Sequence, residues 1–236
     1  MSLLDWLLRR GRSLKPAQRD RLAQWRALGE PALDQPLERQ RLVVVDVEST
    51  GLDVLADRLL AIGAVTVEAS RVVLDRSFYR VLRQERPSEH SNILVHGIGG
   101  SAQTGGDDPV DVLLDFLDFI GKAPLVGFHT QFDEIMIRRA ARRYLGEAFR
   151  RTWIDMAYLA PALRPASRSE PARGLDDWLA DYGIVNYKRH DALADALATA
   201  QLFQVLGRQA ATNGRASAAE VLETARSQQW LARQPR

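Results

Sequence analysis

Two carboxylates interrupt an otherwise apolar run in the segment VVVDVESTGL, residues 43–52. Asp46 and Glu48 are two residues apart, and side chains at that spacing in a strand point to the same face. Buried acids are costly unless they meet a partner of opposite charge. We therefore expect Asp46 and Glu48 to face a cation together, at the end of a strand and just before a Thr-Gly turn.

Two further acids stand in positions where chemistry is possible. Asp133 follows a predicted strand and begins a predicted helix, where an acid also suits the helix dipole. Asp195 lies among small apolar residues of another predicted helix, and His190 precedes it by five residues. Four carboxylates around one cavity would repel one another unless hard cations such as Mg²⁺ or Mn²⁺ neutralised them. This set predicts a site where two divalent ions clamp a phosphodiester and His190 takes a proton from the attacking water.

Composition restricts the classes of function. The chain has 236 residues, of which 46% are hydrophobic, enough for a sizeable core. Its formal charge is +2, from 32 Lys and Arg against 30 Asp and Glu, which permits nucleic-acid binding without requiring it. The absence of cysteine excludes disulfides, thiolate catalysis and Cys-based metal sites. No segment is long and apolar enough to cross a membrane, so we expect a cytoplasmic protein without membrane partners.

The pattern of elements predicts an α/β fold in which helices flank a sheet. Residues 1–40 form a helical N-terminal extension, either an arm that docks a partner or DNA, or a helical hairpin packed on the domain. From there strands come first and then alternate with helices. The predicted strands are 41–46, 59–67, 71–82 and 124–129, the predicted helices are 110–120, 131–146, 174–184, 191–207 and 217–232, and residues 83–109 and 161–174 are predicted loops.

Three ordered motifs carry a family resemblance. They are Asp46-Val-Glu48-Ser-Thr50-Gly51-Leu52, His129-Thr-Gln-Phe132-Asp133 and His190-Asp-Ala-Leu-Ala-Asp195. In these motifs the chain resembles the DEDDh group of DnaQ-like 3′–5′ exonucleases, which includes the proofreading epsilon subunit of bacterial replicative DNA polymerases. The resemblance covers residues 41–206 and leaves 207–236 as a C-terminal helical segment. Two positions depart from the family's usual pattern: Ala61 replaces an acid and His129 replaces an asparagine, neither of them an assigned metal ligand.

The resemblance implies a ribonuclease H-like mixed sheet and a two-ion site. Asp46, Glu48, Asp133 and Asp195 would hold two Mg²⁺ or Mn²⁺ ions, and His190 would be the general base. Thr50, Gly51 and Leu52 would contact the terminal nucleotide, and His96 and Ile98 would line its pocket. For His96, hydrogen bonding inside a loop is the alternative. A sister group uses tyrosine in the third motif, which Tyr187 and Asp191 would fit; we prefer His190 with Asp195, because Asp191 suits a helix cap.

The implied activity is removal of 5′-mononucleotides from the 3′ end of DNA, in proofreading or repair. The alternatives are a 3′–5′ exoribonuclease and a non-catalytic subunit of a DNA polymerase complex, and a polymerase or replisome subunit is the expected protein partner. Two arginine groups are candidates for contact with phosphates: the helix 131–146, whose arginines otherwise form a solvated face, and the loop 162–173, which is the better candidate. The arginines are Arg138, Arg139, Arg142 and Arg143 on the helix and Arg164, Arg168 and Arg173 in the loop.

Overall fold

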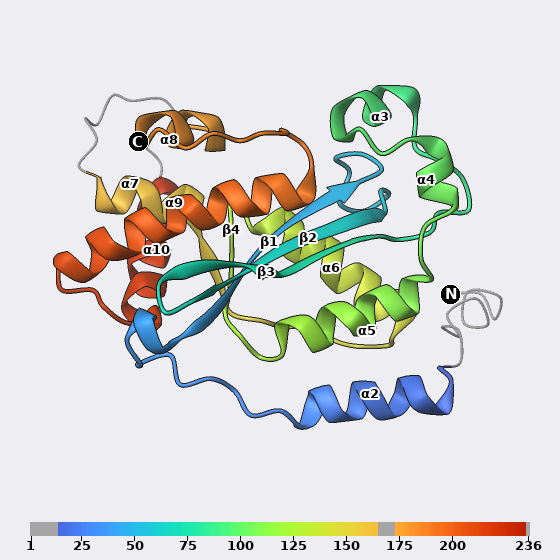
Figure 1. Cartoon of the computed structure of the whole chain (residues 1–236), viewed down its shortest axis with the longest axis horizontal. Coiled ribbons are helices and arrows are strands. Elements are labelled where there is room, and N and C mark those ends of the chain that lie inside the picture. Colours follow the sequence, from blue (N-terminus) through green and yellow to red (C-terminus); the bar gives the residue numbers. More distant parts are fainter. Residues whose placement is uncertain (1–13, 165–172, 235–236) are drawn as a thin grey trace.

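A five-stranded mixed sheet forms the centre of the computed structural model, which describes residues 14–164 and 173–234 (Figure 1). The strand order is β3-β2-β1-β4-β5. The pairs β1–β2 and β2–β3 are antiparallel, whereas the pairs β1–β4 and β4–β5 are parallel. The predicted α/β sheet flanked by helices is therefore confirmed. The strands are β1 (Arg41–Ser49), β2 (Leu59–Glu68), β3 (Arg71–Val81), β4 (Leu125–Gly127) and β5 (Trp153–Asp155).

β1 separates two hydrophobic cores, because alternate side chains of a strand point to opposite faces. Val43, Val45 and Val47 belong to one core, and Leu42 and Val44 belong to the other. The even-numbered face continues into Asp46 and Glu48. The two carboxylates thus lie on the same side of the sheet as the second core, at the point where that core ends.

Helices cover both faces of the sheet. On the even-numbered face α9 packs across β1, β2 and β3, and α7 and α10 pack beside it. On the other face lie α5 and α6; Figure 1 shows α9 in front of the sheet and α6 behind it. Among the described helices, none has the length and apolar character needed to cross a bilayer. The helices on the two faces are α5 (Pro109–Ile120), α6 (Gln131–Tyr144), α7 (Met156–Leu163), α9 (Ala192–Thr212) and α10 (Ala218–Ala232).

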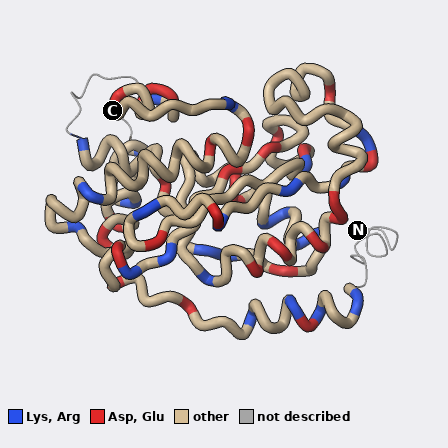
Figure 2. The backbone as a smooth tube through the Cα atoms, in the orientation of Figure 1, with Lys and Arg blue, Asp and Glu red and all other residues tan. Residues whose placement is uncertain are grey.

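The described part of the N-terminal extension packs on the domain. Helix α2 (Pro16–Ala27) lies along α5, and Figure 2 shows basic positions on α2 and acidic positions on α5. Arg21 forms ion pairs with Asp115 (2.8 Å) and Asp118, and the indole of Trp25 donates a hydrogen bond to the carbonyl of Gly121 (2.7 Å). This agrees with the packed alternative for the segment. The apolar stretch at residues 3–8 lies outside the described residues.

The segment just before β1 packs against the start of α10. The N–H of Leu37, in the 3₁₀ helix Leu37–Arg39, donates to the carbonyl of Ala216 (2.7 Å), and the N–H of Ala219 donates to the carbonyl of Leu33 (2.9 Å). Helix α9 continues through residue 207 to Thr212 before α10 begins. The segments that precede and follow the central sheet therefore stabilise each other.

Two predictions about local structure are wrong. The predicted loop 83–109 contains two short helices, α3 (His90–His96) and α4 (Gly100–Thr104). Each buries a single polar residue, His96 or Gln103, so neither displays an apolar period that could reveal it.

The second error concerns the region around Pro161. Strand β5 and helix α7 were not predicted, and α7 passes through Pro161, where a loop was expected to begin. Proline normally ends a helix because it lacks an N–H donor. Here Leu159, Ala160 and Leu163 are buried in the second core, and this burial favours a helix that runs to Leu163. Residues 165–172 of the predicted loop lie outside the described residues, whereas α8 (Leu175–Asp181) confirms the helix expected after them.

Candidate metal centre

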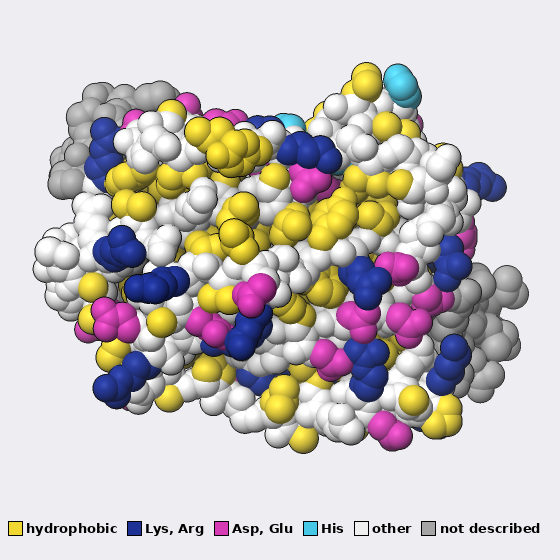
Figure 3. All heavy atoms as spheres, viewed as in Figure 1, with side chains coloured by type: hydrophobic (Ala, Val, Ile, Leu, Met, Phe, Trp, Pro, Cys, Tyr) yellow, Lys and Arg dark blue, Asp and Glu magenta, His cyan; other side chains and the backbone are white. Residues whose placement is uncertain are grey.

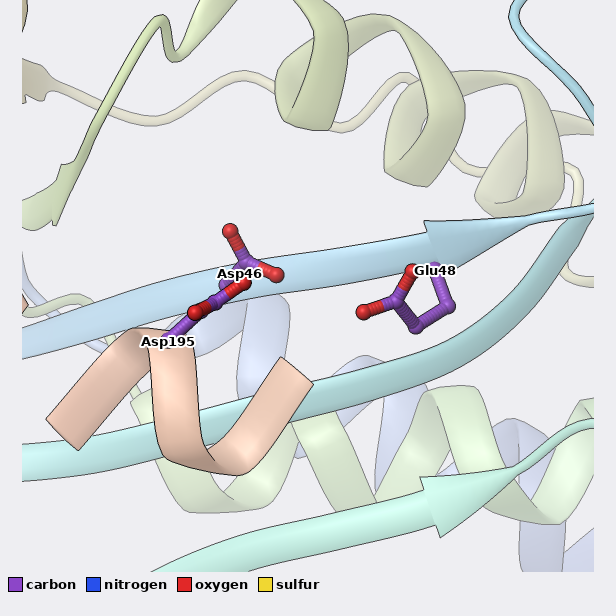
Figure 4. Close-up of side chains that lie close together, drawn as sticks. All are labelled: Asp46, Glu48 and Asp195. Atoms are coloured by element: carbon purple, nitrogen blue, oxygen red, sulfur yellow. The ribbon is translucent and has the colours of Figure 1, made fainter. Parts of the chain in front are cut away.

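Three carboxylates from two distant parts of the chain converge at one end of β1. Asp46, Glu48 and Asp195 each offer an oxygen, and these oxygens lie within 4.8 Å of one another. Figure 4 shows Asp46 and Asp195 side by side, with Glu48 farther along the strand. Asp195 is buried, and the other two are partly buried. Oxygen ligands in this number and spacing fit a hard divalent cation.

A glycine allows Asp195 to reach the strand. Gly63 on β2 is the register partner of Asp46, and the backbone of Ala192 at the start of α9 lies directly over it. A Cβ atom at Gly63 would be 2.2 Å from the carbonyl carbon of Ala192, far inside van der Waals contact. The missing side chain therefore lets α9 begin close to the sheet, which brings Asp195 in its first turn to Asp46.

The electrostatics of the cluster favour a bound cation. Burial raises the pKa of Asp46 well above its ordinary value, and the charges of Asp133, Asp195 and Glu48 raise it further. Burial, followed by the charges of Asp195, Asp191 and Asp133, raises the pKa of Glu48 to about 8. Without a cation, burial and repulsion between the acids therefore favour the protonated forms of Asp46 and Glu48. A divalent ion would neutralise the same charges and displace those protons.

Asp133 lies beside this group but outside it. Val47 of β1 lies beyond Gly127, the residue where its neighbour β4 ends. The N–H of Val47 donates to Oδ1 of Asp133 (3.1 Å). The Asp133 carboxyl is buried, and this burial raises its pKa, although the hydrogen bond from Val47 opposes the shift. The charge of Asp133 raises the pKa of Asp46, so the carboxyl groups of these two residues lie near each other. A role for Asp133 as the fourth metal ligand stays a prediction.

Asp195, rather than Asp191, points into the cluster. Asp191 is the N-cap of α9: its side chain accepts from the N–H of Ala194 (3.2 Å) and from the ammonium of Lys188 (2.9 Å). Tyr187 is 87% exposed. The geometry thus agrees with the preferred form of the third motif, in which Asp191 caps the helix.

His190 lies at the mouth of the site. Its side chain is exposed, and its backbone adopts a left-handed conformation with φ 59°. Its N–H donates to Oδ2 of Asp195 (3.1 Å), which holds the residue next to the cluster. Figure 3 shows the surface hollowed between α3 and the segment that leads into α9, with charged and histidine side chains at its edge. An imidazole exposed at this position is accessible to a water molecule from solvent.

The β1–β2 loop displays Leu52 while it buries Thr50. The hydroxyl of Thr50 donates to Asp57 (2.9 Å) and accepts from the N–H of Arg58 (3.0 Å), which closes the loop upon itself. A side chain at Gly51 would collide with the Asp57 carboxylate. Leu52 is 87% exposed, so its side chain is open to contact from outside the protein. The carbonyl of Thr50 also accepts from the side-chain amide of Asn92 (2.6 Å), so the backbone of Thr50 is held in place.

His96 and Ile98 are both buried, and their expected place beside the terminal nucleotide stays a prediction. His96 is only 3% exposed; its Nδ1 accepts from the N–H of Ile98 (3.0 Å) and its Nε2 lies 3.4 Å from the hydroxyl of Ser88. Burial lowers the pKa of His96. Ile98 packs on Leu60 and Ala61 of β2. These contacts fit the hydrogen-bonded alternative for His96, and both residues support the α3–α4 segment.

The two described arginines of the predicted basic loop form internal contacts. Arg164 and Arg173 both pair with Asp181, and Arg173 also lies over the ring of Trp178 at 4.4 Å. These contacts fix the ends of the segment rather than present free charge. Arg168, the third arginine of that loop, lies outside the described residues.

Sequence reasoning missed the residues that position the ligands. Arg189 donates to Oδ2 of Asp195 (2.6 Å) and pairs with Asp176 (2.7 Å), so it brings positive charge to the cluster. Asn186 donates to the other oxygen of Asp195. Asp155 accepts from the N–H groups of His129 (2.9 Å) and Thr130 (3.1 Å), and thereby holds the turn before α6. Asp155 is the last residue of β5, after Trp153 and Ile154, and it caps α7; this cap pattern was the available signal.

Known proteins share both the sequence and the fold. A DNA polymerase III of PolC type from Thermotoga petrophila is 28% identical over 170 residues, which cover 72% of this chain and 12% of that protein. The DNA polymerase III subunit epsilon of Aquifex aeolicus is 26% identical over 161 residues, or 68% of this chain and 77% of that protein. This chain thus spans about an eighth of the PolC-type relative and most of the epsilon subunit.

The solved structures extend the likeness of fold. Escherichia coli exonuclease I, in a complex with a dT13 oligonucleotide, superimposes with a TM-score of 0.63 at 17% identity, over 75% of this chain and 43% of that one. At this identity the match confirms the exonuclease-like fold and nothing finer. The RNase_T family model, described as exonuclease, matches residues 43–203, a span that contains all three motifs. Since this span is well over half of the chain, the protein belongs to the RNase_T exonuclease family.

Proposed function

We propose that the chain removes nucleotides one at a time from the 3′ end of DNA, as 5′-mononucleotides, in proofreading or repair. The observation that carries this proposal is the convergence of oxygens from Asp46, Glu48 and Asp195 within 4.8 Å. Membership of the exonuclease family supports it, as do relatives named as DNA polymerase III proteins. Association with a polymerase is part of the same proposal, and a cytoplasmic location stays a prediction.

The residues divide the work of hydrolysis. Asp46, Glu48, Asp195 and Asp133 would hold two Mg²⁺ or Mn²⁺ ions, which supply Lewis acidity and stabilise charge on the attacking and leaving oxygens. His190 would accept the proton of the attacking water at the open side of the site. Leu52, exposed on the β1–β2 loop, would contact the terminal base. Arg189 would hold Asp195 in place through its hydrogen bond.

A digestion experiment tests the function and its alternatives. A 5′-labelled single strand of DNA and the RNA of the same sequence are incubated with Mg²⁺, with Mn²⁺ and with EDTA. We expect a ladder that shortens from the 3′ end, requires metal and yields 5′-mononucleotides, with DNA degraded faster. Faster loss of RNA would favour the exoribonuclease. No cleavage of either polymer by a folded, metal-loaded protein would contradict catalysis and favour a non-catalytic subunit.

A further inference from the structure

A cavity with a basic rim lies between the β1–β2 loop and the C-terminal half of α6. Its volume is about 630 Å³. The floor is apolar, from Leu59, Met136 and Ala140, and the ring of Tyr144 lies at its side. One acid and four arginines complete the lining: Asp57, Arg58, Arg139, Arg142 and Arg143. An apolar floor under several positive charges suits a ligand that has flat rings and negative groups.

Three of these five charged groups build the wall of the cavity. The Arg139 guanidinium donates to the carbonyls of Leu55 (2.6 Å), Asp57 (2.9 Å) and Val54, and so ties the β1–β2 loop to α6. Nε of Arg58 donates to the side-chain oxygen of Gln84 (2.9 Å). The Asp57 carboxylate accepts from the hydroxyl of Thr50 and the N–H of Asp53 (2.8 Å). These groups are committed to the protein's own structure.

Arg142 and Arg143 carry the uncompensated charge. Both are exposed, and within residues 14–164 and 173–234 neither guanidinium forms a hydrogen bond or an ion pair. Arg143 lies 5.4 Å from the ring centre of Tyr144. By contrast Arg138, one residue before Arg139, is paired with Glu134 (3.7 Å). The two free guanidinium groups are therefore available to an anion from outside.

The position of the cavity points to a nucleic-acid strand as that anion. Helix α6 runs from Asp133 beside the carboxylates to Arg142, nine residues later, or about 14 Å at 1.5 Å per residue. A stacked single strand covers this distance with about four nucleotides at 3.4 Å each. We propose that Arg142 and Arg143 bind phosphates of the strand being degraded, about four nucleotides from its 3′ end. The inference rests on the proposed function, which places that end at the carboxylates.

Binding tests the site independently of hydrolysis. The affinities of fluorescent dT12 and dT3 are measured by anisotropy in EDTA, for the wild type, R142E/R143E, and the charge-matched control R208E/R215E. Arg208 and Arg215 are exposed on α9 and beyond its end, away from the cavity. We expect R142E/R143E to weaken dT12 binding at least about tenfold and dT3 binding much less, because a trinucleotide whose 3′ end lies at the carboxylates does not extend to Arg142 and Arg143. In R142Q/R143Q the salt slope for dT12 should fall by about 1.4, from two lost contacts at about 0.7 each.

The outcomes distinguish failure of the proposed strand-binding site from failure of the proposed exonuclease function. Equal loss in R142E/R143E and in the control would show a general charge effect and overturn the site, as would equal loss for dT3 and dT12. Thermal unfolding of the variants close to the wild type would show that the fold is intact. If the selective loss of dT12 binding occurs but no strand is hydrolysed with metal present, the strand-binding site stands and the proposed function fails.

Discussion

Asp46 lies directly opposite Gly63 in the antiparallel pairing of β1 with β2, and α9 begins on the backbone of that glycine. Asp46 is a proposed metal ligand, and Gly63 makes room for α9, the helix that carries the second proposed ligand, Asp195. The carboxylate cluster depends on this close approach of backbone to backbone. A change at Gly63 should therefore disturb the site without altering a single proposed ligand.

We predict that Gly63→Ala destabilises the fold and impairs metal binding. The added Cβ would overlap the backbone of Ala192, so α9 must move away from β2. Overpacking of this kind costs about 1–3 kcal/mol, which urea unfolding measures, and Mn²⁺ affinity and hydrolysis should each fall at least about tenfold. The matched control is Gly29→Ala, where a Cβ would meet nothing within 4 Å. Wild-type metal affinity in Gly63→Ala would show that α9 is not held this way.

Substitution of the two aspartates of the third motif should have different effects: a change at Asp191 should alter mainly stability, and a change at Asp195 should alter mainly activity. Asp191→Asn should cost at most about 1 kcal/mol of stability, because asparagine also caps helices, and should keep most activity. Asp195→Asn should abolish hydrolysis, because it removes a charged oxygen from the cluster. Both variants are compared by steady-state hydrolysis and by chemical unfolding. Loss of activity in Asp191→Asn with activity retained in Asp195→Asn would assign the motif to the tyrosine-containing sister group.

His190→Asn should lower kcat by about 10²–10⁴-fold and leave Mn²⁺ binding intact. The loss is that of a general base. Asparagine is chosen because it tolerates the left-handed backbone at φ 59° better than most residues, so the hydrogen bond from this N–H to Asp195 is kept. Single-turnover hydrolysis measures the chemical step, and calorimetry measures the metal. A variant that loses metal binding and activity together would point to a structural role for His190.

Without metal, stability should fall as pH rises from about 5 to about 8. The pKa of Glu48 is raised to about 8 in the folded chain, from an ordinary value of 4.5. The folded state therefore keeps a proton that the unfolded state has released, and its stability declines across this window. Addition of Mn²⁺ at pH 8 should restore the lost stability.

Urea unfolding in EDTA at several pH values measures this dependence. Glu48→Gln should flatten it, whereas the exposed Glu223→Gln should leave it unchanged. A metal-free protein that is more stable at pH 8 than at pH 5 would show that the carboxylates are not held in a desolvated cluster.

The sequence alone predicted the part of the site that depends on local geometry. The spacing of Asp46 and Glu48 placed both on one face, and the motif around Asp195 placed it in the first turn of a helix. Gly63 was not recognised, because its importance arises from a helix more than a hundred residues away. Arg189 and Asp155 act through tertiary hydrogen bonds, which no periodicity reports.

The same reason explains the errors in the fold. Helix α3 buries only His96, which is stabilised by hydrogen bonds to neighbouring loops rather than by an apolar face. Helix α7 continues through Pro161 because its leucines complete a core formed with α9 and α10. In contrast, the predicted helix 110–120 is confirmed as α5, where Asp108 accepts from the N–H of Val110 and Pro109 follows it directly. Structure that depends on neighbouring residues could be predicted from the sequence, whereas structure that depends on contacts between distant parts of the chain could not.

The most direct test of the metal site is a crystal structure of the protein with Mn²⁺ and a deoxynucleoside 5′-monophosphate, using the anomalous signal of manganese. The account predicts two manganese peaks about 4 Å apart. Their ligands should be oxygens of Asp46, Glu48, Asp195 and Asp133, with the nucleotide phosphate between them. No manganese at these carboxylates under conditions that support hydrolysis, or manganese bound at another place, would contradict it.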